Sequence, residues 1–160
     1  MPASLNAPQI DPAIPASLRP VLFSGSSLML DLLKLYTTAL ELDAESVWIL
    51  LHVTEQSMQA FLLDPARARA WTSAAVVSNT VRGWVSRRSV AENTGLPRET
   101  VRRKMAALAA KGLIAEDDLG RIRIRNDGWE TEDLKDFARQ LDDCVQRYQQ
   151  RCSTIRDFMK

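Results

Sequence analysis

The last thirty residues of the chain show the most regular spacing of apolar positions. Apolar or semi-apolar side chains recur at steps of three or four, at Leu134, Phe137, Leu141, Val145, Tyr148, Cys152, Ile155 and Met159. A mean step near 3.5 is typical of the seam between packed helices. Thr131 offers a capping hydroxyl, and two acids follow it in the first turn. The pattern predicts a helix over about 131–159, roughly 43 Å long.

A helix of that length exceeds what a compact domain of this size can cover. We therefore expect dimerisation through the seam, at Leu134, Phe137, Leu141, Val145, Tyr148, Cys152 and Ile155. Packing of the same stripe on the chain's own first helix is the alternative, and the spacing leaves both open.

The first half of the chain predicts two further helices behind an extended arm. Five of the seven prolines lie within the first twenty residues, so residues 1–23 read as an arm without a core. Ser24 to Ser27 offer an N-cap for a strongly apolar first helix over about 26–42, the second dimerisation helix. Asp43 is typical of the cap of the next helix, which extends to about Leu62. Residues 66–80 could form another helix.

The pattern over residues 86–125 predicts two short helices followed by a β-hairpin. Ser86 caps the first helix, and Gly95 suits the steep turn between the two. Pro97 opens the second helix, which runs to about Lys111 and ends at Gly112. Its buried stripe consists of Val101, Met105 and Leu108 at i, i+4 and i+7.

The hairpin combines two short strands with an acidic connection. The strands are residues 113–115 and 121–125, and residues 116–120 join them through Gly120. Strict alternation turns Ile122 and Ile124 to the core and Arg121, Arg123 and Arg125 to the other face.

Charge is distributed unevenly although the net charge is only +1. Residues 82–125 carry eleven Lys and Arg against five Asp and Glu, a balance of +6, and the remainder carries −5. One strongly positive block on an acidic scaffold is typical of a DNA-binding module. Apolar residues make up 46% and charged residues 26%, as in soluble globular proteins. The sequence shows neither a membrane span nor a secretory signal, so we expect a cytoplasmic protein.

Two segments resemble a known family. RETVRRKMAALAAKGLI, residues 98–114, resembles the recognition helix and strand of winged helix-turn-helix regulators of the bacterial MarR and GntR types. LDAESVWILLHV, residues 42–53, is similar to the preceding helix of the MarR type and favours that family. The resemblance implies a mainly α fold with a small β-hairpin wing and long N- and C-terminal dimerisation helices. It places one winged-helix domain over residues 24–160, with the DNA-binding unit at 82–127.

The residues off the buried stripe suggest how such a unit contacts DNA. Arginine can bond guanine in the major groove, near the start of a recognition helix. By resemblance, the base-reading residues are Thr100, Arg102 and Arg103. Phosphate contacts are assigned to Arg87, Arg88, Arg98, Lys104, Arg121, Arg123 and Arg125. Glu99 would cap the helix or accept from cytosine. The acids at the wing tip would be repelled by DNA, so we expect contact along the strand.

Signals for catalysis are missing from the sequence. His52 is the only histidine, and no CxxC pair, phosphate loop or nucleophile motif occurs, so we expect no enzyme, metal or cofactor. Cys144 and Cys152 lie too far apart along one helix for a disulfide. Four tryptophans could line a small-molecule effector pocket or pack in the core: Trp48, Trp71, Trp84 and Trp129.

The sequence therefore predicts a homodimeric transcriptional regulator, in the family's commoner mode a repressor, that binds double-stranded DNA at a roughly palindromic site. Two alternatives are a winged-helix adaptor for proteins and a plasmid-replication or RNA-binding factor.

Overall fold

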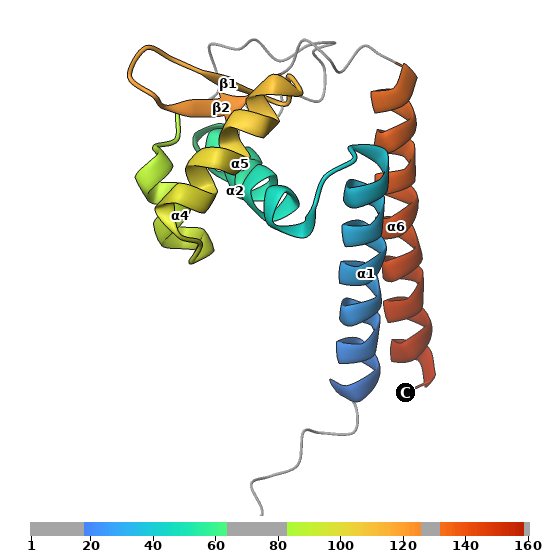
Figure 1. The fold of residues 1–160 in the computed structure, drawn as a ribbon. Helices are drawn as coiled ribbons and strands as arrows, with labels where there is room; N and C mark the ends of the chain where they lie inside the picture. The colour runs from blue at the N-terminus through green and yellow to red at the C-terminus, as the bar shows by residue number, and fades with distance from the viewer. Residues whose placement is uncertain (1–17, 64–82, 126–131, 159–160) are drawn as a thin grey trace, which may run out of the picture. The chain divides into compact units, whose positions relative to one another are not determined.

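The computed structural model describes residues 18–63, 83–125 and 132–158 of the chain. In chain order its elements are α1 (Leu18–Ala39), α2 (Ala44–Leu62), α4 (Arg87–Thr94), α5 (Arg98–Ala110), β1 (Ile114–Glu116), β2 (Ile122–Ile124) and α6 (Glu132–Phe158) (Figure 1). The described protein is mainly helical with a small antiparallel hairpin, which confirms the predicted class at that level. The possible helix at 66–80, the Thr131 cap and arm residues 1–17 lie outside the described residues.

Backbone contacts divide the chain into two compact units, where the sequence predicted one domain after residue 23. The larger, here called the core unit, comprises residues 33–139. The smaller, here called the helix-pair unit, comprises residues 1–32 and 140–160. Two long helices, α1 and α6, contribute to both units.

The core unit is organised around α2, which packs against α4, α5 and β2. Its apolar cluster is shared among these elements and consists of Leu42, Val47, Ile49, Leu50, Val53, Val85, Val90, Ala91, Val101, Met105, Leu108, Ile114, Ile122 and Ile124. The predicted stripe of α5 is confirmed, since its three side chains are at most 1% exposed. Burial of one apolar stripe on each helix is what holds these short elements together.

The hairpin joins the same core through one face. β1 and β2 are antiparallel, with Ile114 opposite Ile124 and Glu116 opposite Ile122. Val85 pairs with Ile122 on the other side through two backbone hydrogen bonds of 2.7 and 2.8 Å. Both isoleucines of β2 are buried, which confirms the predicted alternation.

Local signals set the helix boundaries in the core unit. The Ser86 hydroxyl accepts a hydrogen bond from the Ser89 amide at 3.0 Å, and Asp43 accepts one from the Ser46 amide at 3.0 Å. Gly95 ends α4 with a φ of +70°, a conformation that glycine adopts without strain. The predicted caps at these three positions are confirmed.

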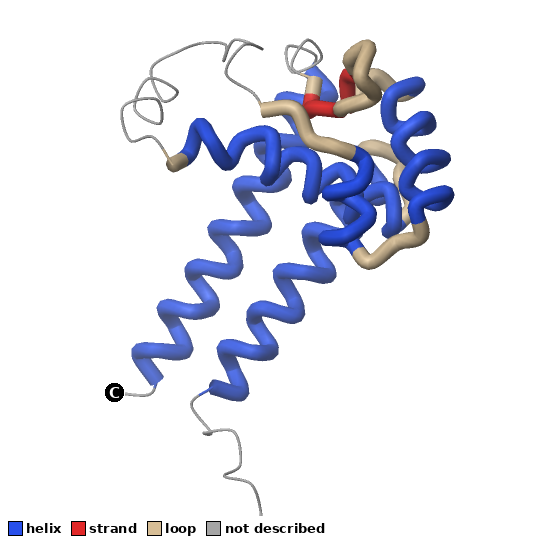
Figure 2. Tube along the Cα trace, turned by 90° about the vertical axis from the view of Figure 1, so that its left-hand side faces the viewer, coloured by secondary structure: helices blue, strands red, loops and turns tan. Residues whose placement is uncertain are grey.

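The helix-pair unit contains α1 up to residue 32 and α6 from residue 140, which run antiparallel (Figures 1 and 2). The prediction of an extended arm is wrong for residues 18–23, because α1 begins at Leu18. Pro20 fits this start, since a first turn needs no amide donor from it. Ser24 is consequently a buried residue inside the helix and not its cap. None of the described helices is both long and apolar enough to cross a membrane.

Truncation of Leu108 tests the central contact of the core unit. Because this side chain is fully buried, Leu108→Ala should lower the free energy of unfolding by about 2–5 kcal/mol. The exposed Leu119 is the matched control, and Leu119→Ala should change it by no more than about 0.5 kcal/mol. Urea unfolding followed by circular dichroism measures both. Equal losses would show that α5 is not anchored through its stripe.

Candidate nucleic-acid interface

The side of α5 opposite the buried stripe carries the candidate binding residues. Arg103 is exposed at the centre of that side, and exposed Arg102 and half-buried Thr100 lie at its two edges. Arg98 is exposed at the N-terminal end of the helix, in line with the stripe. The next turns present Ala106, Ala107 and Ala110, which are also exposed. The outward face is thus basic in its first half and formed by small residues in its second half.

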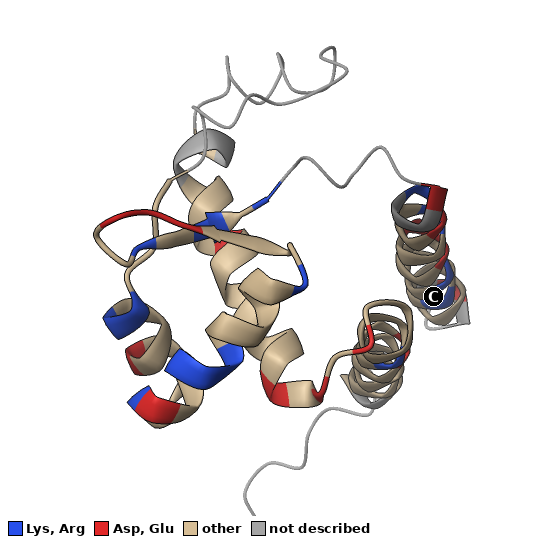
Figure 3. Cartoon of the chain, turned by 45° about the horizontal axis from the view of Figure 1, so that its top comes forward, with Lys and Arg blue, Asp and Glu red and all other residues tan. Residues whose placement is uncertain are grey.

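Helix α4 adds two further basic residues next to this face. It packs directly on α5, and Arg87 and Arg88 occupy its first turn. Figure 3 shows basic segments on both helices. The structure therefore brings together six of the ten predicted contact residues: Arg87, Arg88, Arg98, Thr100, Arg102 and Arg103.

Glu99 engages an arginine and not the helix amides. Its carboxylate accepts two hydrogen bonds from Arg102, at 2.8 and 2.5 Å, and no side chain caps α5. This bidentate contact holds the pKa of Glu99 below its usual value and raises that of Arg102. The predicted acid in the first turn is present, but its bonding partner is the neighbouring guanidinium.

Carboxylates also hold the arginines of α4. Arg88 bonds Glu92 at 2.6 Å, one turn along the helix, and Arg87 pairs with Glu116 at the end of β1. Within the described residues, Arg98 and Arg103 have no ion-pair partner within 4.0 Å. Two arginines on α5 are therefore fully available to an external anion.

Lys104 lies apart from the other candidates. Its ammonium bonds Asp43 at 2.6 Å and lies 3.5 Å from Glu45, so the side chain is only 15% exposed. The hydrogen bond to Asp43 raises the pKa of Lys104 and lowers that of Asp43. This geometry gives no support to the predicted phosphate contact, because Lys104 faces the start of α2.

The hairpin arginines surround a tryptophan. The guanidinium carbons of Arg123 and Arg121 lie 4.3 and 5.9 Å from the ring centroid of Trp84, on the hairpin face turned away from the core. Arg121 also bonds Asp117 at 2.7 Å. Asp117 in turn accepts the amides of Leu119 and Arg121 and so shapes the loop. Arg125 is exposed just beyond β2.

The predicted dimer seam of α6 is largely occupied within the chain. Phe137 is 4% exposed and meets Tyr36 of α1 edge to face, with ring centroids 5.0 Å apart. Partial burial is seen at Leu141, Tyr148, Cys152 and Ile155, while Val145 is exposed and the side chain of Leu134 lies outside the described residues. This arrangement matches the alternative that the spacing left open, in which the stripe packs on the first helix of the same chain.

Sequence reasoning missed two features of these helices. Cys144 is 6% exposed, and it fits the same spacing because it lies three residues after Leu141 and four before Tyr148. The exposed alanines of α5 were also missed, although the buried stripe determines which positions lie opposite it. Both cysteines are free, as their separation predicted.

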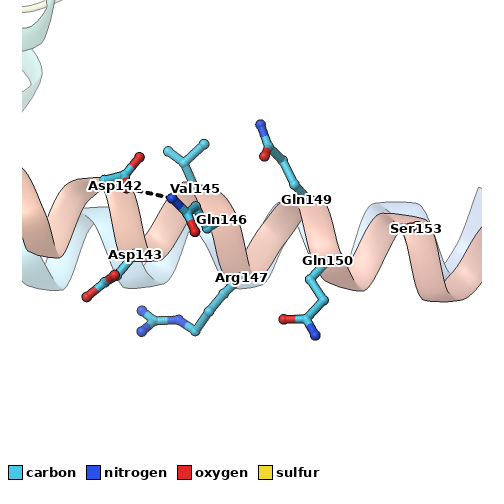
Figure 4. Close-up of a pocket in the computed structure, with 8 residues that line it drawn as sticks. All are labelled: Asp142, Asp143, Val145, Gln146, Arg147, Gln149, Gln150 and Ser153. Atoms are coloured by element: carbon cyan, nitrogen blue, oxygen red, sulfur yellow. Dashed lines mark hydrogen bonds between the residues drawn. The ribbon is translucent and has the colours of Figure 1, made fainter.

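Two of the four tryptophans for which an effector pocket or core packing was left open lie within the described residues. Trp48 is half exposed, Trp84 packs under arginines, and Trp71 and Trp129 lie outside the described residues. One surface hollow is lined by α6 alone, from Asp142 to Ser153, with side chains that project in different directions (Figure 4). Another, of about 480 Å³, lies between α1 and α6 and is lined by Phe23, Arg147 and Ile155 among others. Neither contains a tryptophan.

Comparisons with known proteins add no relative: no protein-family model, curated protein or solved structure matches this chain.

The contact between Asp43 and Lys104 predicts a pH-dependent contribution to stability. A carboxyl group with a lowered pKa stabilises the fold above its unfolded pKa of about 3.9, and this stabilisation is lost as the pH falls through the folded value. Lys104→Gln should raise the pKa of Asp43 toward its usual value, as measured by NMR titration of the carboxyl carbon. Lys111→Gln is the control, since Lys111 contacts Leu40 and Glu41 instead. An unchanged Asp43 pKa in Lys104→Gln would contradict the contact.

Proposed function

We propose that this protein is a sequence-specific regulator of transcription that binds double-stranded DNA through α4 and α5, with β1 and β2 as the wing of a winged helix-turn-helix. The observation that carries the proposal is the outward face of α5, where Arg103 lies opposite a fully buried stripe, with exposed Arg102 beside it and Arg98 exposed at the helix start. A helix anchored on one side and basic on the other fits the major groove.

The composition of that face supports base reading and not only charge attraction. Arg103 lies at the centre of the outward side, where its planar fork could bond guanine. The exposed alanines that follow let the helix approach the bases closely, and a methyl group can contact thymine. We assign Thr100, Arg102 and Arg103 to base edges. Arg87, Arg88 and Arg98 are assigned to phosphates.

The intramolecular ion pairs are compatible with this role. The bonds from Arg102 to Glu99 and from Arg88 to Glu92 involve exposed side chains, and exposed pairs contribute little free energy. A phosphate can therefore replace the carboxylate at small cost, while the pair keeps the arginine extended before binding. Lys104 is left out of the interface because Asp43 and Glu45, at the start of α2, hold its ammonium.

The wing contributes less in this proposal. Its arginines are shared with Trp84 and Asp117, and they lie on the outer hairpin face. In a complex they would contact phosphates at the edge of the DNA site. The proposal assigns no catalytic step to any residue.

Selection of bound fragments from random duplex DNA tests the proposed function. We expect enrichment of an inverted repeat, with affinity that falls as salt rises by about 0.9 log units per phosphate contact for each log unit of salt. Three phosphate-binding arginines in each of the two chains on the repeat correspond to a slope of about −5. No enrichment and no salt dependence would contradict the proposal and favour the alternative of a winged-helix adaptor for proteins. Preference for single strands would favour the RNA-binding alternative.

Single substitutions test the assignment of residues. Arg103→Ala should relax preference at one base pair per half-site, a loss of about 1–3 kcal/mol of discrimination. Arg98→Ala should weaken all sequences alike and reduce the salt slope by about 1 per chain, or about 2 on the repeat.

Lys104→Gln serves as the matched control within α5, because its ammonium contacts Asp43. It should leave both the base preference and the salt slope unchanged. A uniform loss in Arg103→Ala would remove this residue from base reading, and a reduced slope in Lys104→Gln would restore that lysine as a phosphate contact.

A further inference from the structure

Helix α5 carries an acid on the side that the proposed function turns toward DNA. At 100° per residue, Glu99 lies about 40° from Arg103 around the helix, close to the centre of the outward side. Its side chain is 73% exposed. A carboxylate at this place is repelled by phosphates, because duplex DNA carries one negative charge for about every 1.7 Å of its axis. An acid on this face therefore needs a role that compensates for the repulsion.

The carboxylate of Glu99 binds one edge of the Arg102 guanidinium. The Nε of Arg102 donates to Oε2 at 2.8 Å, and its Nη2 donates to Oε1 at 2.5 Å. Two parallel bonds of this kind fix the plane of the guanidinium as well as its position. The same contact holds the pKa of Glu99 below its usual value, so the carboxylate keeps its charge near neutral pH.

The terminal edge of the same guanidinium remains open. An arginine has five N–H donors, and Glu99 uses the one on Nε and one of the two on Nη2. Within the described residues, the remaining donors on Nη1 and Nη2 have no acceptor. Guanine presents O6 and N7 in the major groove as a matching pair of acceptors. Arg102 therefore retains the donors that guanine requires without giving up its bonds to Glu99.

The ion pair within α4 has a different geometry. Arg88 bonds Glu92 through Nε alone, at 2.6 Å. A single bond leaves the plane of the guanidinium free to rotate, which suits a contact to a phosphate better than the recognition of a base edge. The two pairs differ in the same way as the DNA groups to which their arginines are assigned.

We propose that Glu99 is a positioning residue for base reading, which holds Arg102 so that the terminal edge of its guanidinium binds guanine. This inference deepens the proposed function and rests on it. An unrestrained arginine has many rotamers, and immobilising such a side chain on binding lowers affinity by about 2- to 10-fold. Glu99 restrains Arg102 before DNA arrives, and its charge also disfavours a move of this arginine to the phosphates.

The base preference of Glu99→Gln tests the proposal. Glutamine has the same shape but only one acceptor oxygen and no charge, so the bidentate contact is lost. Discrimination at one guanine position should fall by about 2- to 10-fold. Affinity for random duplex DNA should instead rise by about 2- to 5-fold, because a negative charge has left the interface. Competition binding with all single-base variants of the selected site measures both changes.

A double-mutant cycle tests whether Glu99 acts through Arg102. Arg102→Ala should relax preference at the same base pair, by about 5-fold or more. In the Arg102→Ala background, Glu99→Gln should cause no further loss of preference there, because the side chain that it positions is gone. A loss at a different base pair, additive with that of Arg102→Ala, would overturn the proposal and assign Glu99 to direct reading of cytosine.

Glu92→Gln is the matched control, because it removes the singly bonded partner of an arginine that is assigned to phosphates. It should raise affinity for selected and random DNA alike, by about 2- to 5-fold, with base preference unchanged. Circular dichroism checks that each variant keeps its helix content. The same uniform rise in Glu99→Gln would overturn the proposal, since Glu99 would then only weaken the attraction to phosphates.

The restraint on Arg102 is also measurable without DNA, so the two proposals can fail separately. In NMR relaxation, the Nε of Arg102 should be ordered in the parent chain and mobile in Glu99→Gln. Equal mobility in both chains would overturn the positioning role, even if the parent selects a DNA sequence. A parent chain with an ordered Arg102 that enriches no duplex sequence would contradict the proposed function, and base reading by Arg102 with it.

Discussion

Burial of Val101, Met105 and Leu108 in the core shared with α2 and the hairpin is the contact on which the rest of the core unit depends. Fully burying side chains of this size contributes about 1.5–3 kcal/mol each. Because the three occupy one stripe of α5, they also determine which residues face away from the core. Arg103 and the alanines after it lie outward for that reason, so the same packing that stabilises the fold creates the candidate binding surface.

Charge performs two separate tasks in this small unit. Lys104, shielded between Asp43 and Glu45, ties α5 to the start of α2 and helps to set the helix in place. Arg88 and Arg102 are instead paired with acids on their own helices, in water, where the pairing is weak. The difference lies in the location of the carboxylate. A partner on another helix holds two elements together, whereas a partner one turn away on the same helix only orients a side chain.

The two terminal helices, both expected to dimerise, differ in which apolar residues are covered within the chain. The regular stripe of α6 was expected to meet a second chain, yet Phe137 packs on Tyr36 and Cys144 is buried. The apolar surface left outward belongs to α1, whose serines and Asp31 face α6. Both helices carry enough apolar residues to form a seam, and the polar contacts of Arg147 and Arg151 select which side of α1 turns inward.

The sequence by itself determined the local structure from Ser86 to Ile124: the caps, the left-handed turn at Gly95, the stripe of α5 and the alternation of β2 depend on neighbours within a few residues. It also placed Arg103 outward with Arg102 beside it, since the stripe dictates its opposite side. Only the tertiary structure decided that Lys104 faces Asp43, sixty-one residues away, and that Arg123 stacks on Trp84. It likewise decided the start of α1 and its partner face. These outcomes depend on which distant elements meet, and periodicity along one element carries no information about its partner.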